Sequence, residues 1–188
     1  MDSLLPPLVG TFLAEWGDRT QFLVILLAAR FGGSARMLAG IAAAAILNSL
    51  LAAFGGKLIA EVINFQAITL MMAIALLFAA AGGFWPQTAP KLAGAGTAHA
   101  MWISFFAFGV LEFGDKSQFL TATLAARSQS WWLAGLGAGA GIILANVPAV
   151  ILSEKMRDIL PLRAIRLGAS VLLLIAAAIS AIFALRLF

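Results

Sequence analysis

Six long apolar runs constrain the fold of this chain more than any other feature. They lie near 5–29, 35–57, 64–84, 99–126, 131–153 and 165–186. A helix rises 1.5 Å per residue, so about 20 apolar residues cross the hydrocarbon core of a bilayer. Hydrophobic residues make up 63% of the chain and charged residues 11%, against about 25% charged residues in soluble domains. We therefore predict an all-α integral membrane protein, a single domain of six transmembrane helices over 1–188 whose partner is the lipid bilayer.

An internal repeat predicts how these helices are related. Residues 15–30 read EWGDRTQFLVILLAAR and residues 112–127 read EFGDKSQFLTATLAAR, with ten of sixteen positions identical at an offset of 97. Each copy then belongs to a unit of three helices, with repeat one over 1–90 and repeat two over 91–188. Because three is an odd number, the second unit enters the membrane from the opposite side. We predict two inverted three-helix repeats, an architecture common among secondary transporters.

Each repeat carries a Glu-x-Gly-Asp motif near the middle of an apolar run. The two motifs hold four of the eight acidic residues, namely Glu15, Asp18, Glu112 and Asp115. A charged side chain at the centre of a membrane helix costs roughly 2.5–3.5 kcal/mol on insertion scales. Four such acids are a penalty that a structural role alone does not justify. The motifs therefore indicate a functional site close to the bilayer midplane.

The spacing of the motifs predicts the chemistry of that site. In a continuous helix, residues at i, i+3 and i+6 share one face, and each repeat places a Glu, an Asp and a Gln at this spacing. Two such faces form an all-oxygen site, which suits Ca²⁺ or Mn²⁺ and, less readily, the strongly hydrated Mg²⁺. The absence of cysteine and the single histidine exclude thiolate and multi-histidine centres. The predicted ligands are Glu15, Asp18, Gln21, Glu112, Asp115 and Gln118.

The basic and hydroxyl residues of the motifs form a second group. Arg19 and Lys116 follow each Glu by four residues. They either form ion pairs within their own helix or act as tethered cations that compete for the carboxylates. Thr20 and Ser117 point away from the acidic face of a continuous helix, so we predict them only as secondary ligands.

Two further pairs of residues leave alternatives open. Asn48 and Asn146 occupy the second helix of each repeat, where a buried Asn either joins helices or lines the site. Gly17 and Gly114 lie between the acids. They allow either local unwinding of the helix or a close approach of the two motif helices.

Loop cations predict the orientation of the chain. With six spans, both termini share one side of the membrane, and that side holds three loop cations against seven on the other. The three are Lys57, Arg127 and Arg186, and the seven are Arg30, Arg36, Lys91, Lys155, Arg157, Arg163 and Arg166. Because cytoplasmic loops carry the excess of Lys and Arg, we predict that both termini lie outside.

The two motifs, EWGDRT at 15–20 and EFGDKS at 112–117, carry a resemblance to a known family. The chain resembles a family of Mn²⁺/Ca²⁺–proton exchangers with bacterial, chloroplast and Golgi members, long described as uncharacterised membrane proteins. The resemblance extends over both repeats. It implies that the Glu and Asp residues bind a transported cation that is exported from the cytoplasm or loaded into an organelle. The lack of a transit peptide and the short connection between the third and fourth helices indicate a compact bacterial member in the inner membrane.

We therefore predict a transporter rather than an enzyme, an antiporter that exchanges Mn²⁺ or Ca²⁺ for protons without any cofactor. An exporter of another small solute or cation and a channel are the alternatives. An intramembrane aspartyl protease is disfavoured, because the chain has no tyrosine and position 112 is Glu where such motifs have Gly. No basic stretch alternates with aromatic residues, so nucleic acid is not an expected partner. The sequence leaves the choice between a monomer and a homodimer open.

Overall fold

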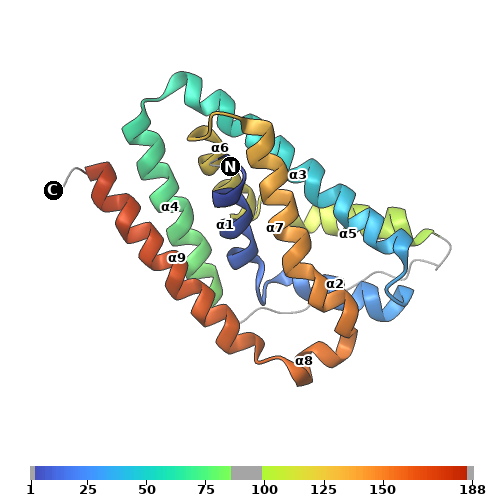
Figure 1. The fold of residues 1–188 in the computed structure, drawn as a ribbon. Coiled ribbons are helices and arrows are strands. Elements are labelled where there is room, and N and C mark those ends of the chain that lie inside the picture. Colours follow the sequence, from blue (N-terminus) through green and yellow to red (C-terminus); the bar gives the residue numbers. More distant parts are fainter. Residues whose placement is uncertain (1–2, 86–98, 186–188) are drawn as a thin grey trace.

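The fold is all-α over the part of the chain that the computed structural model describes, residues 3–85 and 99–185 (Figure 1). In chain order the helices are α1 (Leu5–Glu15), α2 (Arg19–Phe31), α3 (Ala35–Val62), α4 (Phe65–Phe84), α5 (Ala100–Glu112), α6 (Lys116–Ala126), α7 (Trp131–Leu152), α8 (Met156–Ile159) and α9 (Leu162–Leu185). A short 3₁₀ turn, η2 (Ser153–Lys155), joins α7 to α8. The predicted all-helical class is confirmed. The predicted boundary between the repeats, 90/91, lies outside the described residues.

Four of the described helices are long and apolar enough to cross a membrane. They are α3, α4, α9 and the helical stretch Trp131–Lys155, and α5 is a shorter apolar helix. The expectation of continuous helices over 5–29 and 99–126 was wrong. The first is divided into α1 and α2 between Glu15 and Arg19, and the second into α5 and α6 between Glu112 and Lys116. Six spans in two inverted repeats therefore remain a prediction.

A glycine in the left-handed region produces each break. Gly17 has φ +69° and Gly114 has φ +78°, a conformation that disfavours residues with a Cβ. A glutamine side chain then closes each turn, because Gln21 Oε1 accepts from the N–H of Gly17 and Gln118 Oε1 from that of Gly114, both at 2.9 Å. Of the two alternatives for these glycines, the structure shows local unwinding.

Close helix packing repeats at the same offset as the sequence. A Cβ on Gly137 of α7 would collide with the carbonyl oxygen of Leu4, and a Cβ on Gly40 of α3 with that of Met101. Gly40 precedes Gly137 by 97 residues, and Met101 follows Leu4 by 97 residues. The same contact therefore occurs twice, once for each copy of the repeat. In this way α1 packs on α7, and α5 packs on α3. The first helix of each half is therefore held by the first long helix of the other half.

The long helices complete the scaffold around the breaks. α4 and α9 lie side by side and run in opposite directions, as Figure 1 shows. The main buried cluster gathers apolar residues from α2, α3, α5 and α7, with Phe108 fully buried among them. A second cluster joins α1, α4, α6 and α9. Trp16, which precedes Gly17, packs against the first cluster and Gly17 is buried, whereas Gly114 is exposed.

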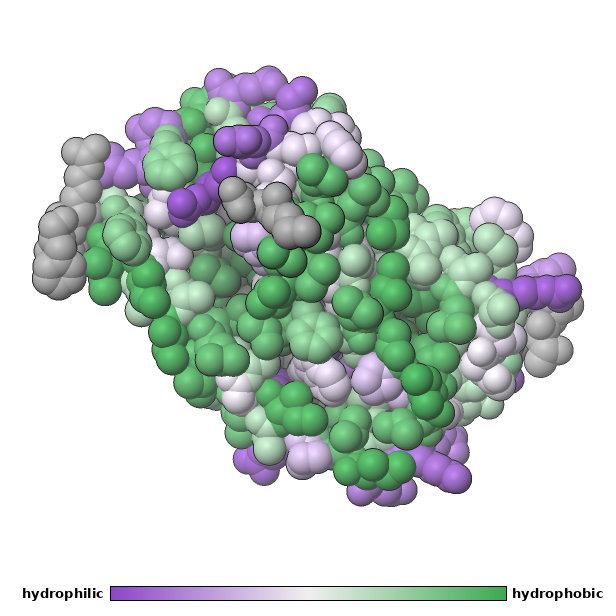
Figure 2. Space-filling model, in the orientation of Figure 1, coloured by the Kyte–Doolittle hydropathy of each residue, from purple (hydrophilic) through white to green (hydrophobic). Residues whose placement is uncertain are grey.

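Apolar side chains cover most of the visible outer surface. Figure 2 shows them over the middle of the molecule, with hydrophilic residues gathered toward its ends. Large residues on the outer faces of the helices are widely exposed, among them Phe78 at 61%, Ile151 at 74% and Phe183 at 73%. A belt of this kind requires lipid rather than water as its solvent.

Several residues counted as loop cations lie inside helices, namely Arg30, Arg36, Lys57, Arg157, Arg163 and Arg166. Lys57 belongs to α3 and lies 3.9 Å from Glu61 one turn later. Arg166 belongs to α9, and its side chain turns inward. Lys91 and Arg186 lie outside the described residues. The orientation of the chain therefore remains a prediction.

Gly56 and Gly55 provide a matched test of the packing of α3. A Cβ at Gly56 would collide with the carbonyl oxygen of Ala122 in α6, whereas a Cβ at Gly55 meets no atom within 4 Å. We expect Gly56→Ala to destabilise the protein by roughly 1–3 kcal/mol through overpacking. Gly55→Ala should be neutral or stabilising, because Ala is the better helix former. Thermal unfolding in detergent measures both, and equal melting temperatures would contradict the proposed contact.

Candidate cation site

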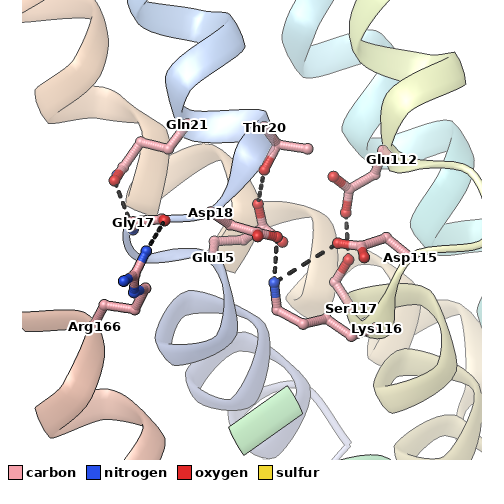
Figure 3. A network of polar contacts seen from close by, with 10 residues as sticks. All are labelled: Glu15, Gly17, Asp18, Thr20, Gln21, Glu112, Asp115, Lys116, Ser117 and Arg166. Atoms are coloured by element: carbon pink, nitrogen blue, oxygen red, sulfur yellow. Dashed lines mark hydrogen bonds and ion pairs between the residues drawn. The ribbon is translucent and has the colours of Figure 1, made fainter. Parts of the chain in front are cut away.

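The two breaks place four acids at helix ends inside the protein. Glu15 is the last residue of α1 and Glu112 the last of α5, and both are completely buried. Asp18 precedes α2 and Asp115 precedes α6 as their N-cap residues. Figure 3 shows the two motifs facing each other, with the side chain of Lys116 between them. Unwinding therefore brings the two motifs together at the ends of four short helices.

Three of the acids form a compact cluster. Glu15, Glu112 and Asp115 each offer one carboxylate oxygen, and these oxygens lie within 4.8 Å of one another. Oxygens on opposite sides of a bound Ca²⁺ are separated by about 4.6–5.2 Å, since each lies about 2.3–2.6 Å from the ion. The cluster therefore has the dimensions of an oxygen site for a divalent cation.

Each buried glutamate has one oxygen engaged and one unengaged. Thr20 donates to Glu15 Oε2 and Ser117 donates to Glu112 Oε1, both at 2.5 Å. Glu15 Oε1 and Glu112 Oε2 are buried and have no hydrogen-bond partner among the described residues. A buried carboxylate oxygen without a partner is costly. This pair of oxygens is therefore the strongest mark of a ligand site in the structure.

The expected direction of Thr20 and Ser117 was wrong. It assumed continuous helices, in which both hydroxyls point away from the acids. Each residue instead lies in the first turn after a break. The change of direction at the left-handed glycine turns that hydroxyl back onto the glutamate five residues earlier.

The single-face arrangement of the glutamines was wrong for the same reason. Gln21 Oε1 accepts from Gly17, and its Nε2 donates to the carbonyl of Ala145 in α7 at 2.7 Å. Gln118 Oε1 accepts from Gly114. Figure 3 shows Gln21 beside Gly17, on the far side of the break from Glu112 and Asp115. The structure thus brings the glutamines to the turns and the acids to the centre.

Lys116 connects the two motifs. Its ammonium forms an ion pair with Asp18 of the first motif, and it lies 3.8 Å from Asp115 Oδ2. Of the two alternatives for Lys116, an ion pair with Glu112 four residues earlier is not observed, and the ammonium pairs with Asp18 and Asp115 instead. Arg19, its counterpart in the repeat, is exposed and lines the cavity described below. The equivalent cations therefore occupy different places.

The two asparagines have different partners. Asn48 Nδ2 donates to the carbonyl of Gly109 at 2.9 Å, which joins α3 to α5. Asn146 Nδ2 donates to Ile142 in its own helix at 2.9 Å, and its buried Oδ1 lacks a hydrogen-bond partner among the described residues. Asn48 thus has the helix-joining role. Asn146 retains an oxygen that is free to accept.

A cavity of about 390 Å³ gives access to the acids. Asp18 and Asp115 line it, whereas Glu15 and Glu112 do not. The remaining lining residues are Arg19, Phe78, Gly82, Gly114, Lys116 and Phe119. A cation entering this cavity therefore meets the aspartates first and the buried glutamates afterwards.

Arg166 also belongs to this region, although no sequence motif predicts it. Its Nη1 donates to the carbonyl of Gly17 at 3.4 Å, from one turn inside α9. The only signal in the sequence is a basic residue at the edge of the last apolar run, which is also where a loop cation stands. Figure 3 shows its guanidinium beside the first break.

Comparison with known proteins gives the family of the chain. Residues 3–91 and 100–186 match the family model described as divalent cation/proton antiporter GDT1. The chain belongs to this family. The resemblance seen in the two motifs is thereby confirmed, and the match covers both halves of the repeat. GDT1 is a family of transporters, in agreement with the prediction that the chain is not an enzyme.

Individual relatives agree with the family. A Vibrio cholerae serotype O1 protein, whose name proposes that it exports manganese, is 33% identical over 174 residues, 91% of this chain and 86% of the relative. A GDT1-like protein of Synechocystis is 36% identical over 83 residues, 42% of this chain and 38% of that protein. No solved structure matches the chain. The chain is thus a multi-pass membrane protein of a cation-transporting family.

The two left-handed glycines generate a graded prediction. Gly17→Ala and Gly114→Ala each place a Cβ in the left-handed region, at a cost of roughly 1–2 kcal/mol. At Gly17 the added Cβ also lies 3.1 Å from the Arg166 side chain, whereas at Gly114 it meets nothing within 4 Å. We expect both variants to melt below wild type in detergent, with Gly17→Ala the lower. Gly168→Ala, in α9 with no atom within 4 Å, is the control, and three equal melting temperatures would contradict the breaks.

Proposed function

We propose that this protein exports Mn²⁺ or Ca²⁺ from a bacterial cytoplasm in exchange for protons, by alternating access around the acidic cluster. Membership of a divalent cation/proton antiporter family supports the class of substrate. The single observation that carries the assignment to this site is the pair of buried oxygens on Glu15 and Glu112 that have no hydrogen-bond partner among the described residues. Both glutamates belong to a cluster whose dimensions suit a divalent ion.

In this proposal Glu15, Asp18, Glu112 and Asp115 bind the ion. All four are oxygen ligands, which Mn²⁺ and Ca²⁺ accept. The unengaged oxygens of the two glutamates and an oxygen of Asp115 supply the inner contacts, and Asp18 receives the ion from the cavity. Thr20 and Ser117 orient the glutamates, while Gln21 and Gln118 hold the turns that carry the aspartates. Asn146 Oδ1 is a candidate secondary ligand.

Exchange follows from the charge of the cluster. Four carboxylates in a low-dielectric interior do not all remain ionised without a positive charge nearby. A divalent cation supplies that charge in one state and protons supply it in the other, so the two compete for the same oxygens. If the protein does not change from one open side to the other while the site is empty and ionised, export of the metal requires entry of protons.

Alternating access follows from the repeat. The contact of Leu4 with Gly137 recurs between Met101 and Gly40, and α4 and α9 run antiparallel. Both features support two inverted units, with each broken helix pair counted as one span. Inverted units provide two mirror-related states around one site. In this proposal both termini lie outside the cytoplasm, as the loop cations predict.

The carboxylates provide the direct test. In proteoliposomes with an imposed pH gradient, Glu15→Gln and Glu112→Gln are each expected to lower Mn²⁺ transport about 100-fold or more, because loss of one partner in a buried ionic site costs roughly 3–5 kcal/mol. Glu61→Gln is the matched control, since Glu61 is exposed on α3 and pairs with Lys57. Transport of Mn²⁺ and Ca²⁺ is read as metal uptake together with internal pH. Wild-type rates in Glu15→Gln, or wild-type protein that moves neither metal, would refute the proposal.

Lys116 provides a second test, because in this proposal its ammonium is the tethered cation that the metal displaces. Lys116→Gln is expected to lower the KM for Mn²⁺ about fivefold or more, since an ammonium 4 Å from a carboxylate is worth about 1 kcal/mol even in water. The turnover rate should fall, because in the variant no ammonium neutralises Asp18 and Asp115 after the metal has left. Arg19→Gln is the matched control from the other repeat and should change KM less. A higher KM in Lys116→Gln would show instead that the lysine organises the ligands.

A further inference from the structure

Arg166 reaches the first helix break from the other half of the chain. It lies one turn into α9, and its Nη1 donates to the carbonyl of Gly17 at 3.4 Å (Figure 3). That carbonyl belongs to the turn that follows α1, where helical carbonyls are left without partners and a cation is favourable. The guanidinium therefore closes the carbonyl end of α1, next to Asp18.

The packing around Arg166 is shaped to admit this side chain. A Cβ on Gly17 would lie 3.1 Å from both Cβ and Cδ of Arg166. On the other side, a Cβ on Gly83 of α4 would collide with Ser170 Oγ and would lie 3.4 Å from Cγ of Arg166. Two glycines thus let α9 approach closely enough for the arginine stem to cover the break.

Arg166 also shares an enclosed space with the ion pair of the site. A cavity of about 10 Å³ is lined by Trp16, Asp18, Lys116, Arg166 and Ser170, among others. A cavity of this size holds at most about one water. The Arg166 Nε is buried and has no hydrogen-bond partner in the described part of the chain. The hydrogen bond from Nη1 to Gly17 is long, and Nε contributes none among the described residues. Breaking the contact between Arg166 and Gly17 therefore costs little free energy.

The second break has no such cover. Gly114 is exposed, a Cβ there would meet nothing within 4 Å, and it lines the cavity of about 390 Å³. The residue 97 positions before Arg166 is Thr69, whose hydroxyl donates to Phe65 in its own helix at 2.8 Å. The two breaks are similar in sequence, but the structure covers one and leaves the other open.

We propose that Arg166 is a positioning residue of the cation site that holds the first break closed over Asp18. It must release the Gly17 carbonyl before the site opens on that side. This inference rests on the proposed function, because it assigns the contact to one step of the transport cycle. Arg166 acts through the turn that carries Asp18 and does not bind the ion.

The test uses the absence of cysteine from the chain. Ser170→Cys introduces a single thiol beside Arg166 with little change in volume, and Ser180→Cys introduces one further along α9. Both serines are buried, at 2% and 8% exposure. A charged, water-soluble thiol reagent is applied to both faces of proteoliposomes, and the labelling rate of each thiol is measured with and without Arg166→Gln.

The expected result is specific to one position. Arg166→Gln should raise the labelling rate at position 170 about tenfold or more and leave that at position 180 unchanged, and Arg166→Lys should restore part of the protection. Arg163→Gln, an exposed arginine on the same helix, should change neither. In the same vesicles Arg166→Gln should lower the maximal rate of Mn²⁺ transport about fivefold or more, with less than a twofold change in KM.

Two outcomes would overturn the inference. One is an unchanged labelling rate at position 170 in Arg166→Gln. The other is an equal rise at positions 170 and 180, which would indicate loosening of the whole helix. Absence of Mn²⁺ transport by the wild-type protein would refute the proposed function instead, and the labelling contrast does not depend on transport.

Discussion

The rest of the structure depends on a left-handed glycine that interrupts a membrane helix between two acids. Gly17 and Gly114 each divide a long apolar segment into two short helices. The glutamate then ends one helix and the aspartate caps the next. Irregular backbone is tolerated at membrane depth only where protein buries it or where it lines a cavity. The first condition holds at Gly17, which is buried, and the second at Gly114, which lines the cavity of about 390 Å³.

The breaks explain why the acids are held in an asymmetric network. Two hydroxyls each donate to one oxygen of a buried glutamate, and the other oxygen has no hydrogen-bond partner in the part of the chain that the structure describes. Lys116 supplies positive charge to both aspartates but comes from one half alone. A repeat that is symmetric in sequence thus produces a site with distinct inner and outer acids. Such a gradation suits an ion that arrives through the cavity and is then desolvated stepwise.

The scaffold gives the site two unequal sides. α1 and α5 are each held by a long helix of the other half, through glycines that admit a backbone carbonyl. Arg166 covers the first break, while the second opens to the cavity. One half carries an arginine where the other has Thr69. Differences of this kind make two alternative conformations unequal in free energy, so that one of them predominates.

The sequence by itself determined the helical membrane class, the 97-residue repeat and the identity of the acids, because apolar run length and identity between copies are local properties. It also predicted the family from two short motifs. Helical periodicity failed at Thr20, Ser117, Gln21 and Gln118, since one left-handed residue redirects every side chain after it. Only the tertiary structure decided that Lys116 crosses to Asp18 and that Arg166 reaches Gly17. Both contacts join residues about 100 or more positions apart, and their geometry depends on helix packing that no local pattern encodes.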